Sequence, residues 1–210
     1  MIRNSTQPKI FYLTLIYFLA VIPLYAQYCS SNATNTGDSD IDRVVLSGDV
    51  ITINQASIGV CAAYTDYTTL AAADITIGLT YSVNITLGTC GGNYNKLATV
   101  YIDWNQDNDF NDPGENVGAT ASTSSTATLT VPFTAGGCGG GAALGITRMR
   151  VVLVEGTSPG PCGTYSWGET EDYQILVKAG AAPTGDFVLM GDAIETGPGC
   201  VRLTSNVNGQ

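Results

Sequence analysis

The chain has 210 residues, with eight lysines and arginines against 18 aspartates and glutamates, and it contains no histidine. The formal net charge of −10 argues against nucleic acid and anionic lipid as partners, because both would be repelled. The lack of histidine removes the commonest general base and the commonest protein ligand of zinc, copper and non-haem iron. The composition does not exclude two kinds of partner, namely neutral glycans and metal cations bound through oxygen ligands.

The first 26 residues predict a secretory signal peptide. Arg3 and Lys9 precede a mostly apolar run at residues 10–22, and the small residue Ala26 follows, which is the order of a signal's three regions. The run is short for a bilayer span. We therefore expect cleavage after Ala26, a secreted or cell-surface protein, and no membrane insertion after cleavage. The alternative is an uncleaved N-terminal anchor, because Leu24 is large for the −3 position.

The chain after Ala26 has six basic and 18 acidic residues, a net charge of −12, and it predicts strands throughout. Three segments alternate apolar with polar residues, the period of a half-buried strand: residues 49–55, 81–87 and 126–132. Three others are richer in apolar residues and fit central strands: residues 97–104, 146–155 and 172–178. Glycine-rich turns separate them. The pattern predicts an all-β fold, an antiparallel β-sandwich with Ig-like or jelly-roll-like architecture.

Composition divides the chain into four segments. We expect a signal peptide at residues 1–26, a β-sandwich domain at 27–178, and a linker of small residues with a proline at 179–184. A new strand pattern then begins at residues 185–210, which we interpret as the truncated start of a second β domain.

The stretch YIDWNQDNDFNDPGE, residues 101–115, concentrates acidic and amide side chains. Oxygen ligands stand at alternate positions and a glutamate closes the run: Asp103, Asn105, Asp107, Asp109 and Glu115. This arrangement is typical of calcium loops, and oxygen-only ligands favour Ca²⁺ over zinc or copper. The glutamate falls at position 13 and Asn108 replaces the glycine of an EF-hand, so only the style of the loop matches. Two other interpretations stay open, namely a solvated Asx turn without metal and a catalytic carboxylate pair.

A second acidic cluster, with Glu169, Glu171 and Asp172, lies in PCGTYSWGETEDYQILV. Alone, it could supply the paired carboxylates of a glycoside hydrolase. The alternative is the start of a strand whose acids pair with arginines. Arg148 and Arg150 are two residues apart and share a strand face, and a guanidinium can bind a carboxylate through two hydrogen bonds. We predict that at least one of these arginines pairs with one of the three acids.

Four motifs, YCSS, YIDWNQDNDFNDPGE, GITRMRV and PCGTYSWGETEDYQILV, occur in the order found in GEVED domains. Residues 28–177 resemble this family of extracellular bacterial β-sandwich modules. The signature reads Gly168-Glu169-Thr170-Glu171-Asp172, with threonine where valine is usual. The resemblance implies a non-catalytic module of a large secreted or surface-displayed bacterial protein, beside enzyme, adhesion or sorting domains.

The six cysteines suggest disulfides in an exported chain, although the sequence alone does not set the connectivity. The resemblance implies a bond between Cys29 and Cys162. We predict a second pair between Cys90 and Cys138, which both lie in glycine-rich turns, and this leaves Cys61 without an assigned partner.

The tail FVLMGDAIETGPGCVRLTSNVNGQ resembles the opening of a legume-type (concanavalin-like) lectin domain, which implies glycan binding by the intact protein. Within the first domain, Tyr165 and Trp167 are candidates for stacking on a sugar, whereas we expect Trp104 to pack in the core.

Together these features predict a secreted or cell-surface, non-catalytic binding or adhesion module, stabilised by calcium and part of a larger multidomain protein. Its expected partner is an extracellular glycan or a surface protein. The alternatives are a purely structural spacer that displays neighbouring domains and an accessory domain of a secreted hydrolase.

Overall fold

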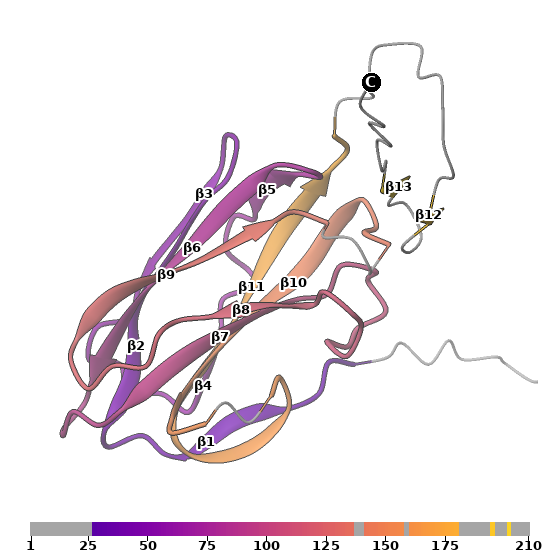
Figure 1. Ribbon diagram of the computed structural model, residues 1–210. Helices are drawn as coiled ribbons and strands as arrows, with labels where there is room; N and C mark the ends of the chain where they lie inside the picture. Colours follow the sequence, from indigo (N-terminus) through magenta and orange to yellow (C-terminus); the bar gives the residue numbers. More distant parts are fainter. Residues whose placement is uncertain (1–26, 137–140, 158–159, 181–193, 196–200, 203–210) are drawn as a thin grey trace, which may run out of the picture.

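The computed structural model describes residues 27–136, 141–157, 160–180, 194–195 and 201–202 (Figure 1). The predicted signal peptide, the predicted linker from residue 181, Cys138 and most of the lectin-like tail lie outside these ranges. Within the tail, β12 (Ile194–Glu195) pairs antiparallel with β13 (Val201–Arg202). In the described ranges, no helix has the length and apolar character needed to cross a membrane.

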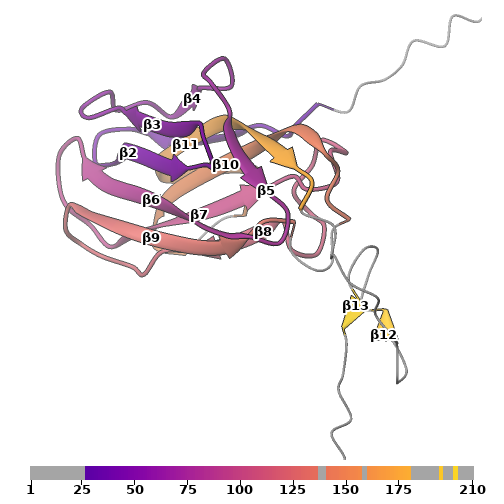
Figure 2. The ribbon, with the colours of Figure 1, turned by 90° about the horizontal axis from the view of Figure 1, so that it is seen from above.

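The described residues between 27 and 180 form a β-sandwich of two sheets, seen as two layers in Figure 2. The larger sheet has the order β1-β11-β10-β7-β8, and β4 and β5 also pair with β11. Its strands are β1 (Ser31–Asn35), β4 (Tyr64–Asp66), β5 (Ala73–Thr76), β7 (Lys96–Ile102), β8 (Asn116–Ala119), β10 (Gly145–Glu155) and β11 (Gly163–Lys178). The smaller sheet has the order β3-β2-β6-β9. Its strands are β2 (Ser39–Ser47), β3 (Thr52–Ala56), β6 (Thr80–Thr89) and β9 (Ala127–Thr134). The predicted all-β sandwich is therefore confirmed.

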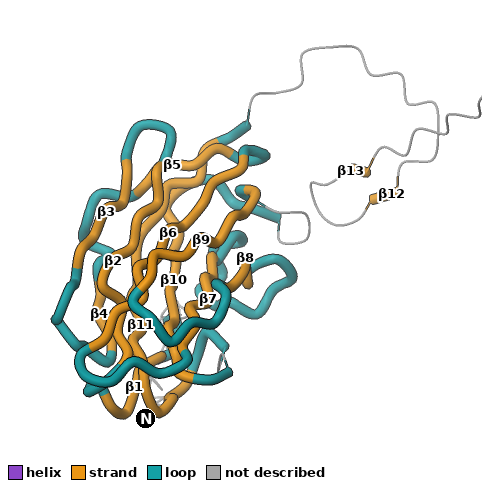
Figure 3. The backbone as a smooth tube through the Cα atoms, turned by 60° about the vertical axis from the view of Figure 1, so that its left-hand side comes forward, coloured by secondary structure: helices purple, strands orange, loops and turns teal. Residues whose placement is uncertain are grey.

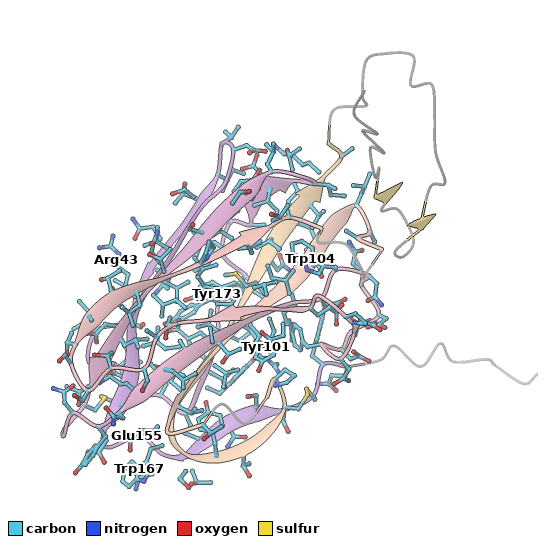
Figure 4. All side chains as sticks on the ribbon, viewed as in Figure 1. Arg43, Tyr101, Trp104, Glu155, Trp167 and Tyr173 are labelled. Atoms are coloured by element: carbon cyan, nitrogen blue, oxygen red, sulfur yellow. A yellow bond between two sulfur atoms is a disulfide. The ribbon has the colours of Figure 1, made fainter. Side chains whose placement is uncertain are left out.

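The hydrophobic core lies between the two sheets and follows the alternation of the strands. On β6 every second residue is fully buried, with Val83 and Ile85 facing the core. On β10, Val151 and Leu153 enter the same core from the other sheet. Trp104 is also fully buried in this cluster, as predicted, and lies inside the sandwich in Figure 4. Each of the six predicted strands overlaps an observed one because this alternation reflects burial.

Strand β11 is much longer than the predicted segment 172–178. It pairs antiparallel with β10 and parallel with β1, β4 and β5, so the sandwich is not purely antiparallel. Glu169 and Glu171, which were expected at the start of a strand, are both 0% exposed inside β11. The charged signature is therefore part of a buried central strand.

Two disulfides connect the described cysteines. Cys29–Cys162 joins the residues just before β1 and β11, which is the pair that the family resemblance implies. The predicted bond between Cys90 and Cys138 is wrong, because Cys90 is bonded to Cys61. The backbone explains this pairing: β2 pairs with both β3 and β6, so the loop after β3 and the end of β6 both lie beside the first half of β2. The Cα atoms of Cys61 and Cys90 lie 5.9 Å apart, a usual separation for a disulfide.

Candidate functional site

A cavity of about 990 Å³ opens beside the Cys29–Cys162 disulfide. Its walls come from the segment that leads into β1, from β4, from β10 and from the acidic loop. The lining residues are Gln27, Tyr28, Cys29, Ser30, Ser31, Asn32, Tyr64, Asp66, Asn108, Arg148 and Arg150. Segments that are far apart in the sequence thus meet at one place, which makes this cavity the best candidate for a ligand site.

A buried ion pair forms the floor beneath the cavity. Arg150 is 2% exposed and donates from Nε to Asp172 Oδ1 at 2.7 Å and from Nη2 to Asp172 Oδ2 at 2.8 Å. Its Nη1 donates to the carbonyl oxygens of Cys29 and Pro161, each at 2.8 Å. The predicted arginine–carboxylate pair is therefore present, and Arg150 also ties both disulfide-linked segments to β11.

The same aspartate also holds two cavity-lining side chains. Arg148 Nη1 lies 3.3 Å from Asp172 Oδ2, and its guanidinium lies 4.1 Å from the centre of the Tyr28 ring, in cation–π geometry. The Tyr64 hydroxyl donates to Asp172 Oδ2 at 3.0 Å. Burial, followed by the charge of Asp172, raises the pKa of Tyr64 to about 12. Asp172, the last residue of the signature, therefore holds the side chains of Arg148 and Tyr64 in place at the cavity.

The acidic loop wraps around two carboxylates that are 0% exposed. Asp103 accepts hydrogen bonds from the amides of Gln106 (2.7 Å) and Asn108 (3.1 Å) and from the Tyr28 hydroxyl (2.5 Å). Glu115 accepts from two amides of the same loop, those of Trp104 and Asp112, at 3.0 and 3.1 Å. Both carboxylates thus satisfy backbone donors of the loop, a role that the alternating spacing did not distinguish from metal ligation.

A second set of acids lies on the outside of this loop. Carboxylate oxygens of Asp107, Asp109 and Asp112 lie within 4.8 Å of one another, and the Asn105 amide donates to Asp107 at 3.0 Å and to Asp112 at 2.6 Å. The structure therefore places Asn105, Asp107 and Asp109 beside Asp112, whereas the other two residues of the predicted ligand set, Asp103 and Glu115, point inward. Asp112 was missed because it breaks the every-second-residue pattern.

The two glutamates of the signature, Glu169 and Glu171, are also buried inside the sandwich. Glu169 accepts from the Ile41 amide at 3.0 Å and from Thr65 Oγ1 at 3.2 Å. Glu171 accepts from the Tyr173 hydroxyl at 2.5 Å and lies 3.0 Å from Ser57 Oγ. Since both glutamates are 0% exposed, neither is accessible to a substrate, and neither lines the cavity. The structure gives no open carboxylate pair here of the kind that a glycoside hydrolase uses.

Burial is the main cause of the raised pKa values in this cluster. It raises the pKa of Glu169 to about 8, with repulsion from Glu171 as the next cause, and that of Glu171 to about 7. It also raises the pKa of Asp40 to about 6. Asp40 is 1% exposed, and its carboxylate has no hydrogen-bond partner among the described residues. The single Ser57 proton cannot serve both Glu171 and the Ile41 carbonyl oxygen 2.5 Å away, so a proton on Glu171 completes this chain of hydrogen bonds.

Comparison with known proteins bears on the second half of the sandwich. Residues 98–176 match the GEVED domain family. The match runs from β7 to β11 and includes the acidic loop, both cavity arginines and the signature. No curated protein matches the chain. One matching solved structure is the CARDB domain of the PF1109 protein from Pyrococcus furiosus, in complex with di-metal ions. Its sequence is 13% identical to this chain and its TM-score is 0.31, and the alignment covers 50% of this chain and 84% of that chain. A TM-score this low supports no conclusion about the present chain.

Neither aromatic residue proposed for sugar stacking lines the cavity. Tyr165, in the GEVED-matching segment, packs against the cluster of Tyr101, Phe110, Val152 and Val154, and its hydroxyl lies 2.8 Å from Thr170 Oγ1. Trp167 lies at the bottom of the molecule in Figure 4, near Glu155. The aromatic side chains of the cavity are instead Tyr28 and Tyr64.

The buried acids of the GEVED signature predict that stability falls as pH rises. A carboxyl whose pKa is raised by folding stabilises the folded state below its unfolded pKa, and this contribution is lost as pH rises through the folded value. For Glu169 and Glu171 the loss runs from about pH 4.5 to the values of about 8 and 7, at up to roughly 1.4 kcal/mol per pH unit for each group. Asp40 adds to it at lower pH, and the buried Lys96 offsets part of its charge. Thermal unfolding at several pH values measures this loss.

The control for this pH effect is the double variant Glu169→Gln/Glu171→Gln. A glutamine amide can still accept from one neighbour and donate to the hydroxyl of Thr65 or Tyr173, but it does not titrate. The variant is expected to show a much flatter dependence of melting temperature on pH. A wild-type melting temperature that is constant or rises from about pH 5 to about pH 8.5 would contradict the prediction.

Proposed function

We propose that this chain supplies a non-catalytic binding module of a secreted or cell-surface protein, and that calcium stabilises the loop beside its cavity. The GEVED match and the two disulfides support the extracellular setting, because disulfides persist in oxidising compartments. The observation that carries the calcium proposal is the close approach of Asp107, Asp109 and Asp112.

The geometry of these three aspartates suits a calcium ion. Ca²⁺ takes six to eight oxygen ligands at about 2.3–2.6 Å, so two oxygens on one ion can lie up to roughly 5 Å apart. The carboxylate oxygens of the cluster lie within 4.8 Å of one another. Without a cation, three carboxylates this close repel one another. The Asn105 side chain, which now donates to two of them, carries an amide oxygen that could join the ligand set.

The loop is also part of the cavity wall, which favours a binding module over a passive spacer. Asn108 lines the cavity. Tyr28, another lining residue, donates to Asp103 and packs on Phe110 with ring centres 5.2 Å apart. An ion that fixes the loop would therefore also fix one side of the cavity.

Calcium titration of the secreted chain tests this proposal. Millimolar Ca²⁺ is expected to raise the melting temperature relative to EDTA, because a ligand at about 100 times its dissociation constant stabilises by roughly 2.7 kcal/mol. The variant Asp107→Asn/Asp109→Asn is expected to lose the shift, whereas Asp66→Asn, an exposed aspartate on β4, is expected to keep it. Calorimetry should give one ion per chain. Identical melting temperatures in Ca²⁺ and EDTA would contradict the calcium proposal and would favour a purely structural spacer.

A further inference from the structure

Arg148 is the cavity's unused cation. Its neighbour Arg150 is buried, and all three of its guanidinium nitrogens donate hydrogen bonds within the protein. The Arg148 side chain is 24% exposed, and its one polar contact within the described part of the chain, from Nη1 to Asp172 Oδ2, is long at 3.3 Å. Its Nε and Nη2 groups have no hydrogen-bond partner among the described residues. A guanidinium presents N–H groups in a fork that matches a carboxylate.

The charged groups in direct contact with Arg148 can take one more anionic group. Arg148 and Arg150 share a single carboxylate in direct contact, that of Asp172, so these three groups together carry one net positive charge. The buried carboxylate of Asp103, which accepts from the Tyr28 hydroxyl, opposes this charge. Asp66 stands among the lining residues and is exposed. Its Oδ1 accepts from the Thr68 amide at 2.8 Å, and its charge offsets part of the attraction that a ligand carboxylate would feel.

The remaining walls offer rings and polar groups but no aliphatic surface. Tyr64, which is 39% exposed, contributes an aromatic face, whereas the Tyr28 ring already contacts the Arg148 guanidinium and Phe110. Ser30, Asn32 and Asn108 contribute hydroxyl and amide groups. No leucine, isoleucine, valine, methionine or alanine is among the described lining residues. A peptide would need an apolar pocket for its side chains, whereas a sugar ring can use an aromatic face together with polar groups around it.

We propose that this cavity binds an acidic saccharide, with a uronic acid carboxylate on the Arg148 guanidinium and the sugar ring against Tyr64. The proposal rests on the binding function proposed above and names its ligand class. It does not require calcium as a ligand, because neither Arg148 nor Tyr64 belongs to the aspartate cluster.

Titration calorimetry of the secreted chain with tetragalacturonic acid tests the assignment, with the fully methyl-esterified tetramer as the uncharged matched ligand. The acid is expected to bind and the ester to bind at least about tenfold more weakly, as for the loss of one charge-assisted hydrogen-bond pair. Arg148→Gln is expected to reduce affinity for the acid by at least about tenfold, with Arg148→Lys intermediate because the fork is lost but the charge is kept. Asp66→Asn is expected to bind the acid more tightly than the wild type.

The matched control is Arg43→Gln, which removes the same charge from an exposed arginine that donates to Asn54 and lies on β2, in the other sheet from Arg148. Its affinity is expected to equal that of the wild type at equal melting temperature. No binding of the acid, equal binding of acid and ester, or equal losses in Arg43→Gln and Arg148→Gln would each overturn the proposal. So would binding of a carboxyl-terminal peptide in place of the saccharide.

Each titration is run in Ca²⁺ and in EDTA, so that the two proposals fail separately. A calcium-dependent melting shift without saccharide binding removes only the ligand assignment. Saccharide binding through Arg148 without any calcium response leaves this site standing and removes the calcium proposal.

Discussion

Replacing Asp172 with alanine is expected to destabilise the domain by about 3–5 kcal/mol, because removing one partner of a buried pair leaves an uncompensated buried charge. Asp172 is 0% exposed and accepts from Arg150, Arg148 and Tyr64. Arg150, itself 2% exposed, would be left with its charge inside the protein. Such a cost is a large part of the stability of a typical domain, about 5–15 kcal/mol. Urea unfolding measures it.

The control for Asp172→Ala is Asp66→Ala, which removes an exposed carboxylate from neighbouring β4 and is expected to change stability by less than about 1 kcal/mol. The paired replacement Arg150→Met/Asp172→Leu is expected to be less harmful than Asp172→Ala alone, because it leaves no buried charge. Equal stability of Asp172→Ala and wild type would show that Arg150 finds another partner.

Replacing Gly168 with alanine is expected to cost more than about 4 kcal/mol and to prevent normal folding. Gly168 has a φ of +138° and pairs with Val154 of β10. A Cβ added there would lie 1.9 Å from the Leu153 carbonyl oxygen and 2.8 Å from its carbonyl carbon. Both are backbone atoms of a central strand, so relief would require β10 and β11 to separate. Soluble yield and melting temperature measure the effect.

The matched control is Gly156→Ala, just after β10. Gly156 also has a positive φ, +86°, but an added Cβ there meets nothing within 4 Å. Only the left-handed backbone is disfavoured for alanine, at roughly 1–2 kcal/mol. Similar losses in the two variants would mean that backbone conformation, and not the close approach to Leu153, is what requires glycine at position 168.

Local pattern was sufficient to predict six of the strands that build the core, but it missed β2 and β5, whose residues Ile41, Val44 and Ile75 are also buried there. Residues 81–87 and 146–155 alternate or concentrate apolar side chains because each strand faces the same interior. Strands β1 and β4 were missed because they are short and polar and are held by parallel pairing with the distant β11. The length of β11 was underestimated because Glu169 and Glu171 are buried with polar partners, which a hydrophobicity pattern cannot show.

The candidate site was predictable only in its parts. The two-residue spacing of Arg148 and Arg150 was enough to predict a carboxylate partner, and the acidic composition of residues 101–115 was enough to mark the loop. The cavity itself could not be predicted, because it depends on which loops the disulfides and β11 bring together. The inward turn of Asp103 depends likewise on Tyr28, which lies 75 residues earlier.

The placement of the Cys29–Cys162 bond at the start of both β1 and β11 determines how the domain would carry mechanical tension. β1 lies at one end of the sandwich, and the chain leaves β11 at the other end (Figure 1, Figure 3). Force applied between the chain before Cys29 and the chain after Lys178 would pass through the Cys29–Cys162 disulfide and then along β11 alone. The residues between the two cysteines, which include the acidic loop and Arg148, would then lie outside the path of the force. In oxidising surroundings, these cavity walls would thus keep their shape under tension, whereas Gln27 and Tyr28, which precede Cys29, would lie on the pulled segment.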